Sequence, residues 1–334
     1  MNAPGIRRLA GNLLLLAGTF FFFALVLELC LRLTGFQYVL RPQDIQFGRP
    51  EPVLLKVAFQ EDDDLFWVRP GYEQKLERLR EQKPSLLLLG DSCTDLGHWD
   101  QELAALYRAR FGQDLSWGNL AVAGWSSYQG LRQLERDVPG MAPKVVLAYF
   151  GWNDHWIGFG IEDKNVAGVK RLFSSRTSGS RLVQLLTKAY LAWGTRETAL
   201  PNRVSLSDFS SNLEAMAAET RDLGARLMIL TAPSNHVAGQ EPPGGLEDRW
   251  MRDVAELVPL HQSYAEAARK TARDSGALLC DLAADFAALT AEERAGLFMD
   301  DGIHFQPAGD AKLAGFVFAC LDEAGLLPTL DAPG

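Results

Sequence analysis

Two segments far apart in the chain carry residue types that together could do nucleophilic chemistry. The first is GDS at residues 90–92, which follows an apolar run and offers Ser92 as a nucleophile on a turn. The second is DDGIH at residues 300–304, in which Asp301 and His304 stand three positions apart. On a tight turn this carboxylate can hold one imidazole nitrogen while the other nitrogen faces the pocket. The two segments therefore offer a candidate nucleophile and a candidate acid–imidazole pair.

Two further segments could supply hydrogen-bond donors to an oxyanion. NLAVAG ends at Gly124, where a backbone N–H can approach a ligand closely, and GWND places the Asn153 amide after another apolar run. Each segment also has a purely structural interpretation, because Asp91 or Ser92 can cap a helix, and glycine and Asn-Asp are common in turns. It is the order and the positions of the four segments together that favour an enzyme site.

The elements that must position these residues are short apolar runs that alternate with amphipathic segments from residue 85 onward. Runs such as LLLLG and VVLAYFG are apolar at nearly every position, which is typical of strands covered on both faces. The alternation predicts a parallel sheet between layers of helices, with the site at the carboxyl ends of the strands. We expect strands at residues 85–89, 115–122, 144–150, 225–231 and 277–282, and helices near 100–111, 127–138, 207–223, 261–275 and 307–324.

The N-terminus has the pattern of a membrane segment. Residues 9–27 are almost wholly apolar, and as a helix they would be about 28 Å long, enough to cross a hydrocarbon core. Arg7 and Arg8 favour a cytoplasmic N-terminus, although Arg32 and Arg41 on the far side weaken this orientation. We expect a retained signal anchor rather than a cleaved signal peptide, because no A-x-A-like pattern follows the run. In either case the remainder would lie outside the cytoplasm.

The patterns divide the chain into three parts. Residues 1–34 are expected to form a cytoplasmic stub and transmembrane anchor, and residues 35–84 a connector that packs partly on the domain that follows. Residues 85–334 would form the α/β domain, with an insertion at about 155–202 that holds no predicted strand. Connections of this length are typical of lids and binding loops. An amphipathic helix is expected within it at residues 181–193.

Composition excludes several classes of protein. Hydrophobic residues make up 47% of the 334, which excludes global disorder. There are 42 acidic and 33 basic residues, a formal net charge of −9, so no basic surplus exists for binding a nucleic-acid backbone. The five histidines and four cysteines lack metal-binding spacing, and we expect no metal or other cofactor. Buried free thiols are favoured over a disulfide for the cysteines, which are Cys30, Cys93, Cys280 and Cys320.

Taken together, the four segments resemble the SGNH (GDSL-like) hydrolase family. LLLLGDSCT, NLAVAG, GWND and DDGIHFQPAG occur in the family's order and at comparable separations, across about residues 85–324. The anchor and FWVRPG at residues 66–71 look similar to membrane-tethered bacterial members. The resemblance implies a flavodoxin-like three-layer α/β/α sandwich with a parallel sheet, and serine esterase chemistry. The chain departs from the family at Phe305, where many members carry proline, and in its long insertion.

The resemblance also implies a role for each matching residue. Ser92 would be the nucleophile, and His304 would take its proton and later protonate the leaving alcohol. Asp301 would orient the imidazole, for which Asp300 is a less favoured substitute, and Asp91 would brace the turn rather than react. The oxyanion hole would combine three donors, each worth very roughly 3 kcal/mol, namely the N–H groups of Ser92 and Gly124 and the side-chain amide of Asn153.

Aromatic side chains gather beside the same segments. Trp125 and Trp152 could stack on a sugar ring or wall an acyl pocket, or they could simply fill the core. His155 follows the predicted oxyanion segment and could touch a substrate, with a packed or surface histidine as the alternative.

We therefore expect a membrane-anchored, extracytoplasmic serine esterase that hydrolyses an ester-linked acyl group, with acetyl favoured. The favoured substrate is an envelope carbohydrate, because such polymers are within reach of a domain outside the membrane, which in a Gram-negative source would be periplasmic. Three alternatives remain open because fold does not fix function. They are an O-acyltransferase to a polysaccharide with a membrane acyl-donor partner, a lipid esterase or lysophospholipase, and a non-catalytic polysaccharide-binding or scaffold protein.

Overall fold

A computed structural model describes residues 3–36, 58–158, 162–166, 179–194, 201–241, 251 and 253–330. The chain divides into two compact units. The smaller unit comprises Met1–Arg41 and Val166–Ala199, and the larger comprises Pro42–Asn165 and Leu200–Gly334. All the predicted site residues belong to the larger unit.

The larger unit is built on a five-stranded parallel sheet with the strand order β4-β3-β5-β6-β7. In order of appearance along the chain this is 2-1-3-4-5, the flavodoxin-like arrangement. The central strands β3 and β5 are buried at every position, which explains their uniformly apolar sequences. Each strand overlaps a predicted run: β3 (Leu86–Gly90), β4 (Trp117–Asn119), β5 (Val145–Tyr149), β6 (Arg226–Leu230) and β7 (Leu278–Cys280).

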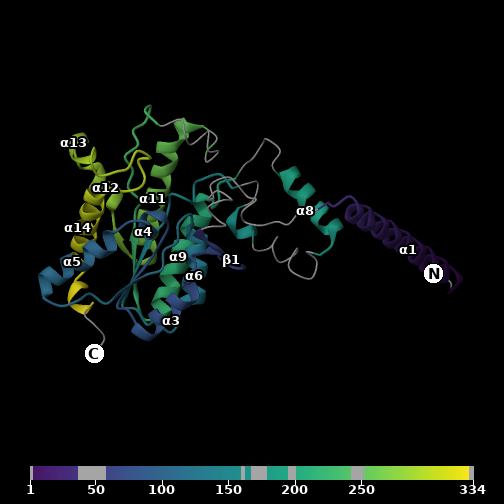
Figure 1. Cartoon of the computed structure of the whole chain (residues 1–334), viewed down its shortest axis with the longest axis horizontal. Coiled ribbons are helices and arrows are strands. Elements are labelled where there is room, and N and C mark those ends of the chain that lie inside the picture. The colour runs from purple at the N-terminus through teal and green to yellow at the C-terminus, as the bar shows by residue number, and fades with distance from the viewer. Residues whose placement is uncertain are drawn as a thin grey trace. The chain divides into compact units, whose positions relative to one another are not determined.

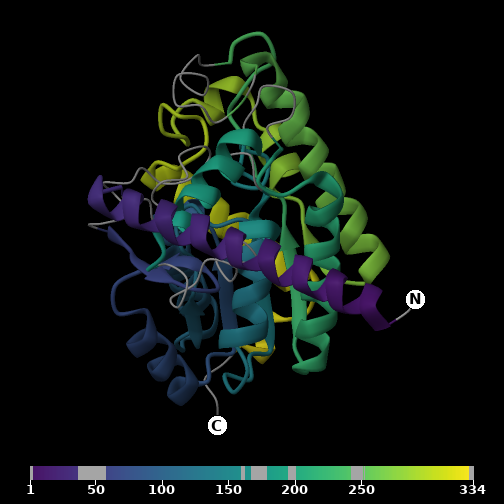
Figure 2. The same ribbon diagram turned by 90° about the vertical axis from the view of Figure 1, so that its right-hand side faces the viewer.

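Helices cover both faces of the sheet and complete three layers (Figures 1 and 2). On one face α5 (Trp99–Phe111) packs against α14 (Pro307–Glu323). On the other face α9 packs between α6 and α11, with bounds α6 (Ser127–Asp137), α9 (Leu206–Asp222) and α11 (Leu257–Ser275). All five match predicted helices to within a few residues, and the predicted α/β/α fold is confirmed. Shorter helices complete the unit: α4 (Ser92–Asp95), α12 (Leu282–Ala287) and α13 (Ala291–Arg294).

The described part of the predicted connector, residues 58–84, contains a hairpin and a helix that sequence analysis does not anticipate. β1 (Gln60–Asp62) pairs antiparallel with β2 (Phe66–Val68), and all three β2 residues are buried. The helix α3 (Tyr72–Gln82) buries only Tyr72, Leu76 and Leu79 among many charged residues. Because only this narrow stripe of α3 is apolar, the segment is mostly charged, and its composition therefore favours the prediction of a connector.

A disulfide links Cys280 at the end of β7 to Cys320 in α14, and the two residues are 40 positions apart. The prediction of free thiols is therefore wrong for this pair. Apolar surroundings suit a cystine as well as a thiol, so the sequence pattern does not separate the two. Cys93 is a buried free cysteine, as predicted, and Cys30 is free but exposed on the N-terminal helix.

The smaller unit pairs the N-terminal helix with a helix from the predicted insertion. The helix α1 (Ala3–Leu33) contains a stretch, Gly11–Leu33, with a mean hydropathy of 2.4, which is long and apolar enough to cross a membrane. The helix α8 (Arg181–Gly194) coincides with the amphipathic segment predicted at residues 181–193, and it contacts α1.

A carboxylate within the apolar stretch accounts for the start of α8. Glu28 accepts hydrogen bonds from the N–H groups of Arg181 (3.0 Å) and Leu182 (2.7 Å) and from the Ser180 hydroxyl (2.9 Å). Arg32 donates to Glu28 at 2.8 Å and to the Gly179 carbonyl at 2.6 Å. Because the first N–H groups of a helix have no partner within it, Glu28 satisfies donors that would otherwise be unpaired.

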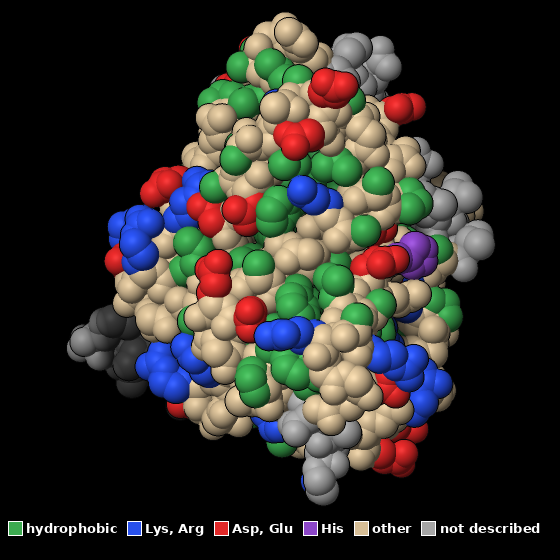
Figure 3. All heavy atoms as spheres, turned by 90° about the vertical axis from the view of Figure 1, so that its left-hand side faces the viewer, with side chains coloured by type: hydrophobic (Ala, Val, Ile, Leu, Met, Phe, Trp, Pro, Cys, Tyr) green, Lys and Arg blue, Asp and Glu red, His purple; other side chains and the backbone are tan. Residues whose placement is uncertain are grey.

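Charged side chains of both signs are interspersed on one face of the molecule. On the face shown in Figure 3, Lys and Arg lie among Asp and Glu and do not gather in one basic area.

Candidate active site

Ser92 lies on the turn between β3 and α4, at the carboxyl edge of the sheet. The Asp91 carboxylate accepts the N–H of Cys93 at 3.0 Å and so caps α4, as expected of a residue that braces the turn. The turn is close-packed at Gly90, where a Cβ atom would lie 2.7 Å from the Thr94 hydroxyl and 3.1 Å from a backbone carbonyl. Glycine is therefore required immediately before this turn.

The structure brings the predicted nucleophile, base and orienting acid together. The Oγ of Ser92 lies 2.8 Å from Nε2 of His304, and Nδ1 of His304 lies 2.6 Å from Oδ2 of Asp301. The other Asp301 oxygen accepts the N–H groups of Ile303 and His304, both at 2.9 Å. Since both carboxylate oxygens are held, the imidazole is fixed with one nitrogen toward Ser92. Asp300, the less favoured substitute, lines a neighbouring pocket instead.

The protonation of this set follows from its contacts. Burial opposes charge on His304, but the hydrogen bond and charge of Asp301, together with the charge of Asp91, raise its pKa above the usual value. Burial also opposes charge on Asp301, yet its hydrogen bonds to His304 and to the backbone lower its pKa to about 2. Asp301 is therefore ionised at neutral pH, where it stabilises an imidazolium on His304.

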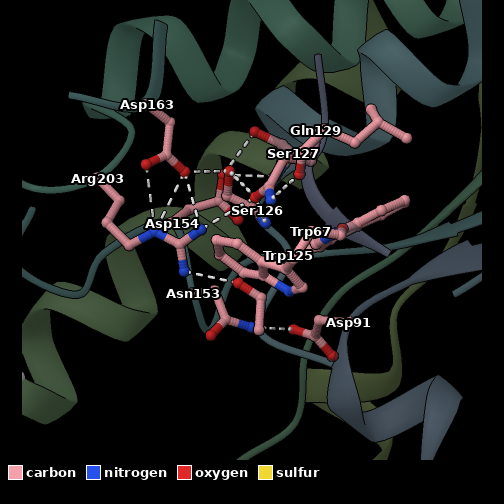
Figure 4. Close-up of polar contacts among 12 residues, drawn as sticks. Trp67, Asp91, Trp125, Ser126, Ser127, Gln129, Asn153, Asp154, Asp163 and Arg203 are labelled. Carbon is pink, nitrogen blue, oxygen red and sulfur yellow. Dashed lines mark hydrogen bonds and ion pairs between the residues drawn. The ribbon is translucent and has the colours of Figure 1, made fainter. Parts of the chain in front are cut away.

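The three predicted oxyanion donors follow β3, β4 and β5, which are neighbours in the sheet, so the donors meet at one edge. Nδ2 of Asn153 donates one hydrogen to Oδ2 of Asp91 at 3.1 Å (Figure 4). Among the described residues, the second hydrogen of this amide and the N–H groups of Ser92 and Gly124 have no acceptor. Gly124 adopts a φ of 81°, which favours glycine.

Asp91 has a second function that sequence analysis misses, because it holds the Asn153 side chain as well as the turn. The carboxylate is buried, and burial raises its pKa to about 6 despite hydrogen bonds from Cys93 and Asn153. A buried acceptor of this kind fixes the plane of the Asn153 amide, so the free amide hydrogen has a defined direction.

The predicted substrate-contacting residues are all buried. The exposed fractions are 0% for Trp125, 2% for Trp152 and 1% for His155. The Trp125 indole donates to the Trp67 carbonyl at 2.9 Å, and the Trp152 ring stacks on His261 with ring centroids 3.8 Å apart. In this conformation none of the three offers a surface to a ligand, and a role in substrate binding remains a prediction.

His155 and His261 form a buried hydrogen-bonded pair. Nε2 of His155 lies 3.1 Å from Nδ1 of His261, whose Nε2 lies 2.8 Å from the Ala232 carbonyl. Burial holds the pKa of His155 well below its usual value and lowers that of His261 to about 4, so both rings are neutral. Within the described residues, no group of three or more His, Cys, Asp or Glu side chains is placed to hold a metal ion.

A pocket of ≈ 290 Å³ lies beside the loop that carries Asp301. Its wall includes Asp300 and Gly302 on either side of that residue, and polar side chains of Asn235, His236 and Gln240. Phe298, Met299, Val237 and Ala295 complete the lining.

Comparison with protein families identifies the class to which this fold and site belong. A profile of the GDSL-like Lipase/Acylhydrolase family matches residues 88–312, more than half of the chain. The chain therefore belongs to this family, also called the SGNH hydrolases, and is an ester hydrolase of that type. No curated protein matches the chain.

Several solved structures are similar to the chain at low sequence identity. A lipase/acylhydrolase from Enterococcus faecalis is 16% identical, over 75% of this chain and 98% of that chain, with a TM-score of 0.46. A GDSL-like lipase from Bacteroides thetaiotaomicron is 14% identical, over 76% and 98%, with a TM-score of 0.47. A variant of an acetyl xylan esterase from Geobacillus stearothermophilus is 17% identical, over 73% and 95%, with a TM-score of 0.46.

Proposed function

We propose that this protein is a serine esterase in which Ser92, His304 and Asp301 form the catalytic set. The observation that carries the proposal is the continuous line of hydrogen bonds from the Ser92 hydroxyl through the imidazole to the Asp301 carboxylate. A serine hydroxyl is a weak nucleophile unless an adjacent base takes its proton, and here the base is within hydrogen-bond distance.

The proposed reaction has two steps. The Oγ of Ser92 attacks the ester carbonyl carbon while Nε2 of His304 takes the hydroxyl proton. The C–O bond to the alcohol then breaks, and His304 returns the proton to the leaving alcohol. Water then attacks the acyl-serine while the same imidazole takes its proton, the bond between the acyl carbon and Oγ of Ser92 breaks, and His304 returns the proton to Oγ as the acid is released. The N–H groups of Ser92 and Gly124 and the free Asn153 amide hydrogen would stabilise the negative oxygen in each step.

For the substrate, we propose a short acyl ester, probed first as acetate, on a carbohydrate of the cell envelope. The support is the pocket beside Asp301, since Asn235, Gln240 and Asp300 are side chains that hydrogen-bond to sugar hydroxyls. An alkyl chain would leave these polar groups unpaired, which disfavours a lipid substrate there.

For the location, we propose that α1 is a retained membrane anchor and that the larger unit lies outside the cytoplasm. The Cys280–Cys320 disulfide supports an oxidising compartment. The contacts of Glu28 support retention, since cleavage after α1 would remove the carboxylate that caps α8.

The test uses the full-length protein in detergent, beside Ser92→Ala, on p-nitrophenyl acetate, butyrate and decanoate and on acetylated xylo-oligosaccharides. We expect highest activity on acetyl esters and a loss of roughly 10⁴-fold or more in the variant. Equal rates in the two proteins would refute the catalytic set. A preference for decanoate would point to a lipid esterase, and activity only with an added sugar acceptor would point to an acyltransferase.

A further inference from the structure

We propose that Trp67 and Arg203 are positioning residues that hold the Gly124 N–H in the direction an oxyanion requires. The proposal rests on the function proposed above for the site. It concerns the loop formed by residues 122–125, called here the oxyanion loop, which follows β4.

Three side chains from other parts of the chain hold the oxyanion loop. Asp95 accepts the Ala123 N–H at 2.8 Å, and the Trp67 indole donates to the Ala123 carbonyl at 3.0 Å. Arg203 donates to the Gly124 carbonyl at 2.7 Å. Of the four backbone polar groups of Ala123 and Gly124, only the Gly124 N–H has no acceptor among the described residues. At Ala123 and Gly124 the backbone is therefore held at every polar group except the donor that the reaction would use.

The geometry of the peptide bond links these contacts to the direction of the Gly124 N–H. In a trans peptide the carbonyl and the N–H point in opposite directions, and no cis peptide bond occurs in the described residues. The Ala123 carbonyl and the Gly124 N–H belong to the same peptide. The hydrogen bond from the Trp67 indole to this carbonyl therefore also sets the direction of the Gly124 N–H. Glycine has unusual conformational freedom, so this direction would be loosely defined without a contact on each side. Arg203 supplies the contact on the far side, at the Gly124 carbonyl.

The two positioning side chains are themselves fixed by burial. Trp67 is 1% exposed and Arg203 is 0% exposed. The Arg203 guanidinium pairs with the fully buried Asp163 at 2.9 Å and donates to Gln129 at 3.0 Å, as Figure 4 shows. It also lies 5.7 Å from the centre of the Trp67 ring. A bidentate, buried ion pair restricts the side chain far more than a surface pair would.

Asp95 connects the oxyanion loop to the helix that carries Ser92. It stands at the end of α4, the helix that begins with Ser92, and Arg69 donates to it at 2.8 Å. The oxyanion loop is thus joined to the serine turn on one side and to Trp67 and Arg203 on the other. These contacts set the spacing between the Ser92 N–H and the Gly124 N–H.

The test is Trp67→Phe in the full-length protein, with Tyr72→Phe as its matched control. Each change removes one buried polar group and keeps an aromatic ring. The Tyr72 ring lies beside Trp125, a contact that phenylalanine keeps, while its hydroxyl bonds to Asp137 and Gln133 and not to the oxyanion loop. With p-nitrophenyl acetate we expect Trp67→Phe to lower kcat about 10-fold, less than loss of a whole donor, with KM within about twofold. Tyr72→Phe should lower Tm, because its hydroxyl is buried and hydrogen-bonded, and keep the parental kcat.

A second variant separates positioning from folding. Arg203→Lys keeps a positive charge beside Asp163 but cannot hold Asp163 and Gly124 with the same fork, so kcat should again fall with little change in KM. Equal kcat in the parent, Trp67→Phe and Arg203→Lys would overturn the proposal. So would a loss of kcat in all three variants, Tyr72→Phe included, that tracks the loss in Tm. If Ser92→Ala remains active, the proposed function itself fails, which is a distinguishable result.

Discussion

At the scale of single residues, the proposed reaction depends on whether the imidazole of His304 is protonated. The base must be neutral to accept the serine proton, and its pKa is raised above the usual 6.5 by Asp301 and Asp91 against the effect of burial. We expect kcat/KM for p-nitrophenyl acetate to be low in acid and to rise with pH through an apparent pKa above 6.5.

Replacing Asp301 with Asn tests the origin of that pKa. Without the carboxylate, burial dominates at His304, so the apparent pKa from the pH–rate profile should fall below that of the parent. The loss of imidazolium stabilisation should lower kcat by roughly 10⁴-fold. An unchanged apparent pKa in Asp301→Asn would show that another group controls the acid limb of the profile.

The amide of Asn153 would make a separate contribution, since in the proposed reaction it acts on the oxyanion and not on the proton. We expect Asn153→Ala to lower kcat by about 10² to 10³ with a small effect on KM, as removal of one oxyanion donor does. Asn212→Ala is the matched control, because that amide donates to the Ser127 hydroxyl at 2.9 Å. Similar kcat losses in both variants would assign the effect to folding.

How far single residues can be predicted from sequence depends on how local their geometry is. Asp301 and His304 are three positions apart, so a turn suffices to join them. By contrast, Arg203 lies 40 residues from Asp163, its buried partner, and 79 from Gly124. Only the folded chain brings these together. Likewise, position near a strand end does not reveal which way a ring points, and Trp125 turns into the core.

At the scale of elements, the sheet is readable because buried parallel strands are apolar at every position. The ends of the strands cannot be read from the sequence in this way. For example, β4 spans only Trp117–Asn119, within a predicted run of eight residues, 115–122. The hairpin of β1 and β2 consists of three-residue strands, too short for any periodic signal. The hairpin nonetheless carries Trp67 to the oxyanion loop, so an element outside the recognisable pattern supports the site.

The disulfide joins two elements and should contribute to their stability. It closes a segment of about 40 residues between β7 and α14, which in the chain-entropy account corresponds to roughly 4 kcal/mol. We expect the double variant Cys280→Ser, Cys320→Ser to unfold at lower urea concentration and to be unaffected by reductant. The parent protein should move toward the variant when reduced. Equal unfolding midpoints for the parent with and without reductant would contradict a stabilising bridge.

For the whole molecule, the apolar helix and the disulfide bear on the same question of compartment. An oxidised Cys280–Cys320 pair suits a domain outside the cytoplasm, and α1 suits a helix that holds it at the membrane. A cleaved signal sequence would need no structural partner, whereas α1 has one in α8 through Glu28. That contact gives the carboxylate of an otherwise apolar stretch a partner, which supports the proposal that α1 remains part of the mature chain.

The proposed retention of α1 gives a prediction for the full-length protein in its native membrane. The mature chain should begin ahead of Gly11 and should stay with the membrane after an alkaline wash. Glu28→Ala should speed hydrogen exchange at the start of α8, because the N–H groups of Arg181 and Leu182 lose an acceptor worth about 1 kcal/mol. The exposed Glu102 of α5 provides the control, since Glu102→Ala should leave that exchange unchanged. A mature N-terminus beyond residue 33 would show that α1 is removed, and the cap on α8 would then belong to the precursor alone.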